Sequence, residues 1–134
     1  MSRILTVATI WFALWASSAA ASSTAYKCTI KNALTTSQGK AVQHLLGESM
    51  VGKEFFVDRT NGRIRGEVFS SAAWATTQVL DNGSSQQSFK ALYLSSPYVH
   101  VRVLVVQEFD EGKSKSFVLL DDGDFISGTC VGLS

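Results

Sequence analysis

The most strongly β-forming part of the chain is the stretch YVHVRVLVVQEF, residues 98–109. Valine occupies every second position from 99 to 105, and the alternate positions from 100 to 108 hold His, Arg, Leu, Val and Glu. β-branched residues at a period of two are typical of a strand. Because apolar side chains fall on both faces in the middle of this stretch, we expect it to be a central strand.

Downstream, residues 117–131 predict a hairpin that turns at Asp122-Gly123 and carries Cys130 in its second strand. This turn sets Asp121 opposite Asp124, and like charges at such positions repel. A calcium ion could relieve the repulsion, but the spacing and the distal glutamate of a calcium loop are absent. We therefore expect a solvated acidic turn without a metal.

Upstream, residues 53–69 predict a second hairpin around Asn61-Gly62, the favoured pair for a two-residue turn. That register sets Asp58 opposite Arg65 as a cross-strand charge pair. One face of this hairpin is then apolar: Phe55, Val57, Ile64 and Val68.

The remaining segments complete a mainly β chain. Residues 26–33, 75–80 and 88–95 read as strands, and residues 81–87 read as a loop rich in Ser and Gln. Residues 39–50 are the one helical stretch, because Val42, Leu45, Leu46 and Met50 follow helical spacing. A meander whose last strand returns to its first predicts a small antiparallel barrel or sandwich of six to eight strands with one short helix.

The N-terminus has the pattern of a cleavable signal peptide. Arg3 precedes an apolar run over residues 4–16, and Ala19-Ala20-Ala21 fits a cleavage site. We expect residues 1–21 to be removed and residues 22–134 to form one domain in the periplasm or outside the cell. An uncleaved anchor is the alternative; a lipid anchor is disfavoured because Tyr26-Lys27 precede Cys28.

Two cysteines near the ends of an exported domain, Cys28 and Cys130, predict a disulfide. Free thiols or a metal pair are the alternatives, and no C-x-x-C spacing supports a metal. The whole chain has 12 Lys+Arg against 11 Asp+Glu, so loss of Arg3 leaves 11 of each. A neutral domain has no general attraction to nucleic acid or to an anionic membrane, and we expect neither a nucleic-acid partner nor a stable membrane anchor.

Three stretches together carry a resemblance: FFVDRTNGR at 55–63, GSSQQSFK at 83–90 and SGTC at 127–130. They resemble small exported proteobacterial proteins of unknown function that carry one cysteine near each end of the mature domain. The resemblance covers most of the mature chain. It implies export and a bacterial source, and it implies no catalytic residues.

No enzyme motif stands out. The chain has no G-x-S-x-G elbow and two histidines, His44 in the expected helix and His100 on the central strand. Both are more readily explained as structural or surface residues than as general bases. We therefore expect no catalytic residues and no cofactor.

Candidate binding residues are few. Arg59 and Arg63 lie with Arg65 at one hairpin, where guanidinium groups could bind phosphate or carboxylate. Trp74, in a loop of small residues, and His100 complete the set.

These features favour a non-catalytic exported β module that binds a protein, a glycan or a small apolar ligand, with an envelope or extracellular protein as one possible partner. An inhibitor or partner of an extracytoplasmic enzyme, and a hydrolase with an unrecognised site, are the alternatives.

Overall fold

The structure is a computed structural model that describes residues 23–71 and 76–134. The expected signal peptide and Trp74 lie outside the described residues. Within the described ranges the chain forms nine strands and one helical turn, which are β1 (Ala25–Ser37), β2 (Lys40–Gln43), α1 (Gly47–Met50), β3 (Glu54–Asp58), β4 (Ile64–Gly66), β5 (Thr76–Asn82), β6 (Phe89–Leu94), β7 (Val101–Val106), β8 (Ser114–Asp121) and β9 (Asp124–Leu133). No helix in these ranges is long and apolar enough to cross a membrane.

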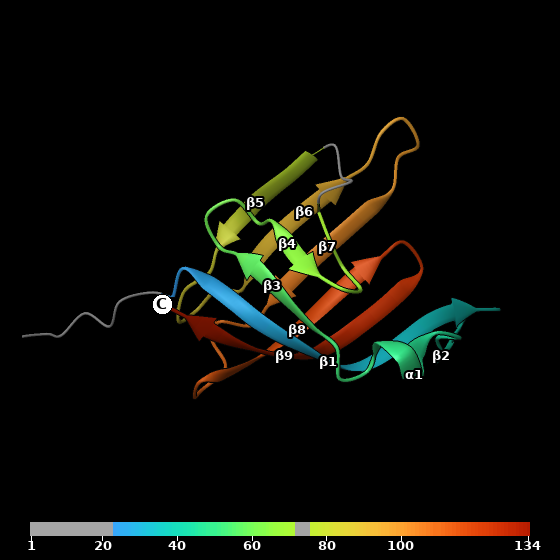
Figure 1. Cartoon of the computed structure of the whole chain (residues 1–134), viewed down its shortest axis with the longest axis horizontal. Coiled ribbons are helices and arrows are strands. Elements are labelled where there is room, and N and C mark those ends of the chain that lie inside the picture. The colour runs from blue at the N-terminus through green and yellow to red at the C-terminus, as the bar shows by residue number, and fades with distance from the viewer. Residues whose placement is uncertain (1–22, 72–75) are drawn as a thin grey trace, which may run out of the picture.

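The strands form one antiparallel sheet in the order β4-β3-β1-β9-β8-β7-β6-β5, with β2 paired to the far end of β1. The sheet curls into a half-barrel, so that β3 and β4 come to lie in front of the middle of the sheet in Figure 1. The mainly β prediction is confirmed. The chain has one curled sheet, as in a barrel, and not the two stacked sheets of a sandwich.

The strands alternate buried and more exposed positions, so one face of the sheet carries the buried side chains. In the curled sheet these side chains fill the concave face and form the core. Burying aromatic and aliphatic side chains on one face is the main stabilising contribution to such a sheet. Its largest fully buried members are Tyr26, Ile30, Phe55, Ile64, Phe89, Tyr93, Leu104, Leu119 and Ile126.

The first and last strands are neighbours, as the meander predicted. Cys28 lies directly opposite Cys130 in the β1–β9 pair, and the two sulfur atoms are bonded across a sequence separation of 102 residues. Both cysteines are fully buried. The disulfide therefore joins the two ends of the domain inside the core.

The two strongest strand predictions are also confirmed. β7 lies between β6 and β8, so residues 98–109 do contain a central strand. β8 and β9 turn at Asp122-Gly123 with Asp121 opposite Asp124. Asp122 adopts φ +51°, the left-handed conformation that aspartate tolerates better than most residues.

The predicted helix over residues 39–50 is wrong. Gln38 and Gly39 have φ values of +50° and +74° and turn the chain back, so that β2 hydrogen-bonds to β1. The helix is the single turn of α1. Leu45 is 98% exposed whereas Met50 is buried, so the apolar residues whose spacing suggested a helix do not share one buried face.

The predicted register of the β3–β4 hairpin is wrong by two residues. Val57 pairs with Ile64, and Phe56, not Asp58, lies opposite Arg65. A two-residue slip keeps every side chain on its face, so Phe55, Val57 and Ile64 are buried as predicted. The hairpin loop is consequently longer than the two-residue turn.

The hairpin loop closes the curl of the sheet. A Cβ atom built on Gly62 would lie 3.3 Å from the Cβ of Ala91 and 3.2 Å from a methyl group of Thr77, which places the loop against β5 and β6. Gly62 has φ +76°, and the Tyr93 hydroxyl donates to its carbonyl oxygen. A residue with a side chain would be both strained and crowded here.

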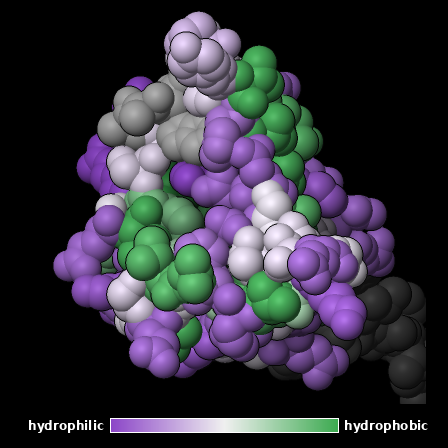
Figure 2. Space-filling view, turned by 90° about the vertical axis from the view of Figure 1, so that its right-hand side faces the viewer, coloured by the Kyte–Doolittle hydropathy of each residue, from purple (hydrophilic) through white to green (hydrophobic). Residues whose placement is uncertain are grey.

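Figure 2 looks onto the end of the molecule that carries α1, β2 and the β8–β9 turn. Apolar side chains there form separate groups between polar ones.

Candidate functional site

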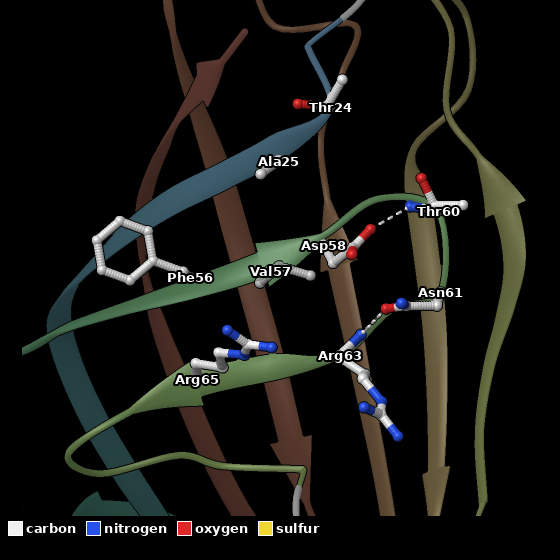
Figure 3. A pocket seen from close by; sticks show the side chains of 9 residues that line it. All are labelled: Thr24, Ala25, Phe56, Val57, Asp58, Thr60, Asn61, Arg63 and Arg65. Carbon is white, nitrogen blue, oxygen red and sulfur yellow. Dashed lines mark hydrogen bonds between the residues drawn. The ribbon is translucent and has the colours of Figure 1, made fainter.

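A pocket of about 390 Å³ opens on the convex side of β1, β3 and β4 (Figure 3). It is lined by Thr24, Ala25, Phe56, Val57, Asp58, Thr60, Asn61, Arg63 and Arg65. The alternation of β3 buries Phe55 and Val57 and turns Phe56 and Asp58 outward. Ile64 is buried in the same way, which turns Arg63 and Arg65 outward on either side of it.

Local hydrogen bonds fix the loop that forms one wall of the pocket. The Asp58 carboxylate accepts from the Thr60 amide at 2.8 Å, and the Asn61 side-chain oxygen accepts from the Arg63 amide at 2.9 Å (Figure 3). The Gly62 amide donates to the Asp58 carbonyl at 2.7 Å. Such side-chain turns are a local preference of Asp and Asn. They explain why the loop is longer than the Asn-Gly pair alone indicates.

The arginines of the predicted cluster separate into two environments. The Arg59 side chain is mostly buried: it donates to Ser23 Oγ and to the Asn82 carbonyl, and lies 3.6 Å from a Glu108 oxygen. Arg63 and Arg65 are exposed, and neither has a carboxylate within 4.0 Å among the described residues. The predicted Asp58–Arg65 pair is not formed, because Asp58 is directed to Thr60 and lies opposite Ala25.

Arg59 belongs to a polar group that closes one end of the sheet. Its guanidinium lies over the Tyr26 ring, 4.9 Å from the centroid, and the Tyr26 hydroxyl donates to Glu108. Burial of that hydroxyl, followed by its hydrogen bond to Glu108, raises the pKa of Tyr26. A second, wider pocket of about 780 Å³ next to this group has a mixed lining that includes Arg59, Glu108, Lys113 and Lys115. We assign Arg59 a structural role.

His100 lies at the opposite end of the sheet, beside the β8–β9 turn. Its Nδ1 atom is 3.5 Å from Asp121, and its Nε2 atom contacts Asp122. These three residues could hold a cation, since one ligand atom of each lies within 4.8 Å of the others. Arg102 donates to Asp121 at 2.7 and 3.1 Å, however, and its positive charge opposes a second cation there.

His44 does not lie in a helix. It precedes α1, where its Nδ1 atom accepts from the Leu46 amide and its Nε2 atom lies 3.2 Å from Asp124. Both histidines therefore contact aspartates of the β8–β9 turn region, and the structure does not bring them into the pocket of β1, β3 and β4.

Of the predicted binding residues, only Arg63 lines that pocket; Arg59 and His100 lie elsewhere, and Trp74 lies outside the described residues. Sequence reasoning missed Thr24 and Phe56. Thr24 lies next to the β1–β3 pair, where its carbonyl oxygen accepts from the Arg59 amide, a contact over more than thirty residues of sequence that no local pattern reports. Phe56 was visible as an outward-facing aromatic position in the alternation of β3.

Comparisons of the chain with protein families, with curated proteins and with solved structures find no significant match.

Proposed function

We propose that the protein is a non-catalytic binding module whose pocket on β1, β3 and β4 holds an anionic group: a carboxylate, a phosphate or a sulfate. The observation that carries this proposal is the pair Arg63 and Arg65, two guanidinium groups in one pocket without an ion pair among the described residues. Arginine recognises such oxyanions through paired hydrogen bonds.

The other polar groups of the pocket suit the same ligand. The Asn61 oxygen is used by the Arg63 amide, which leaves its NH₂ group as the outward donor. Thr60 adds a hydroxyl. Asp58 is the one carboxylate in the lining, and it already accepts a backbone hydrogen bond. Two arginines against one aspartate leave the pocket net positive, although the chain as a whole is nearly neutral.

We also propose that the protein works outside the cytoplasm. The disulfide supports this proposal, because such bonds persist in oxidising compartments. The N-terminal pattern supports it independently, because Arg3 precedes an apolar run over residues 4–16 and the small residues Ala19-Ala20-Ala21 follow that run. The ligand would then belong to the cell envelope or to the surrounding medium.

The test is calorimetric titration of the mature protein with inorganic phosphate and with sulfate at low ionic strength. We expect saturable binding that Arg63→Gln/Arg65→Gln weakens by at least about tenfold, since a hydrogen bond to a charged group contributes roughly 1.5–3 kcal/mol. The control is Lys31→Gln/Lys40→Gln, which removes the same charge from exposed positions outside the pocket. If both double variants weaken anion binding equally, the loss follows from net charge alone, which would contradict an anion site at Arg63 and Arg65.

A further inference from the structure

Phe56 is an exposed aromatic ring in the same pocket. Its side chain stands on the convex side of β3, and the residue is 44% exposed. The close ring contacts among the described residues join Tyr26 to Phe89 and Phe55 to Phe69 and Phe117, so Phe56 has no aromatic partner there. An exposed ring of this kind offers its face to a ligand.

Phe56 lies between two basic residues on the neighbouring strands. Lys27 lies opposite Phe56 on β1, and Arg65 lies opposite it on β4. Lys27 is paired with Glu54 at 3.1 Å, whereas Arg65 has no ion pair in the described part of the chain. Figure 3 shows the Arg65 side chain reaching from β4 toward β3, whereas the Phe56 ring leans from β3 toward β1. The available positive charge therefore lies on the strand next to Phe56, directly opposite it in the register.

We propose that the anionic ligand is an acidic saccharide, with the C–H face of a sugar ring on Phe56 and its carboxylate, sulfate or phosphate on Arg65 and Arg63. This inference rests on the proposed function. Phe56 and Arg65 lie opposite each other on neighbouring strands, which are about 4.8 Å apart, so a short saccharide can reach both. The pocket volume of about 390 Å³ is in the range of small-ligand sites.

The rest of the lining matches a saccharide better than an apolar or protein ligand. Thr60 and the Asn61 amide supply hydrogen-bonding groups for sugar hydroxyls at the other side of the arginines. Charged and polar residues surround Phe56, namely Lys27, Glu54, Asp58 and Arg65. A single ring in a polar surrounding is not the broad apolar patch by which a protein partner usually binds.

The experiment compares four probes by titration calorimetry: inorganic phosphate, a sulfated heparin disaccharide, a galacturonate trimer and a neutral cellotriose. We expect an acidic saccharide to bind roughly three- to tenfold more tightly than phosphate, because the ring contact adds to the ionic one. Phe56→Leu should remove that gain, so that the ratio of saccharide affinity to phosphate affinity falls to about one, and Phe56→Tyr should retain the gain. Phe125→Leu is the matched control, since Phe125 is 40% exposed on β9 outside this pocket.

The outcomes separate the two proposals. Phosphate binding that depends on Arg63 and Arg65, with no gain for either acidic saccharide, would overturn the saccharide assignment alone. A gain that survives in Phe56→Leu would do the same. Failure of every anionic probe to bind the folded wild-type protein would overturn both. Adenosine monophosphate is added as a fifth probe, and its tighter, Phe56-dependent binding would assign the ring to a nucleotide base and overturn the saccharide.

Discussion

Arg59 and Arg63 are four residues apart but have different environments: Arg59 is bound within the protein and Arg63 faces the pocket. Arg59 is at the start of the hairpin loop and turns back to Ser23, Tyr26 and Glu108, where its charge is used inside the protein. Arg63 follows the Asn61 turn and faces outward. The sequence alone groups them with Arg65 as one basic tip, whereas Arg59 is engaged within the protein and Arg63 and Arg65 remain available to a ligand.

Tyr26 and Tyr93 are expected to set the alkaline limit of stability. Burial raises the pKa of both hydroxyls above the ordinary value of 10.0, and the hydrogen bond to Glu108 adds to the rise for Tyr26. Above pH 10 the unfolded chain releases protons that the folded chain retains, so the free energy of unfolding falls as the pH rises; below pH 10 this contribution is complete.

The measurement is an alkaline titration of Tyr98→Phe, followed by tyrosinate absorbance and by far-ultraviolet circular dichroism. We expect the two signals to change together, because Tyr26 and Tyr93 ionise only as the protein unfolds. Tyrosinate absorbance that rises while the circular dichroism stays native would show that these hydroxyls are accessible and contradict their burial.

The pairing of β1 with β9 requires a close approach of the two backbones at one point. Its register shifts between Ile30 and Asn32, and Gly128 on β9 lies against this bulge. A Cβ atom on Gly128 would overlap the Thr29 carbonyl oxygen and lie 2.8 Å from the Phe117 ring. Only a glycine lets the two backbones approach this closely.

Gly128→Ala should therefore lower the free energy of unfolding by about 2–3 kcal/mol, the cost of forcing backbone apart in a packed region. The control is Gly47→Ala, whose added methyl group would make an ordinary contact at 3.4 Å from the Ala33 carbonyl oxygen. Urea unfolding of both variants is the measurement. A Gly128→Ala variant as stable as Gly47→Ala would show that the backbones of β1 and β9 do not approach this closely at Gly128.

What the sequence predicted follows from how local each feature is. β7 and the β8–β9 hairpin are visible because valine alternation and Asp-Gly act within a few residues. The β3–β4 register was missed because the side chains of Asp58 and Asn61 compete with the two-residue turn. The helix over residues 39–50 was wrong because pairing with β1 supplies backbone partners that apolar spacing does not report. The pocket joins Thr24 to Arg65 through β3, which only the sheet order reveals.

The molecule as a whole is a half-barrel whose two ends close on separate polar groups. Tyr26, Arg59 and Glu108 lie at one end, and His100, Arg102 and Asp121 lie at the other. The disulfide ties the first strand to the last in the core between them. With these charges paired internally, the convex face of β1, β3 and β4 keeps the unpaired arginines of the described chain.

Export and oxidation should be visible together in the intact mass of the protein recovered from its host. We expect a chain that begins near Ser22 and has lost one hydrogen from each thiol, because the N-terminal pattern predicts cleavage and Cys28 is bonded to Cys130. Recovery of the chain with Met1 and two free thiols from the cytoplasm would contradict the proposed export.

Amide chemical-shift mapping during titration of the ¹⁵N-labelled mature protein with inorganic phosphate tests the binding site at atomic detail. We expect saturable shifts at Thr24, Thr60, Asn61, Arg63 and Arg65, with amides near His100 and near Glu108 unchanged. Shifts centred instead on Lys113 and Lys115 in the wider pocket, or no saturable shifts at all, would contradict an anion site between Arg63 and Arg65.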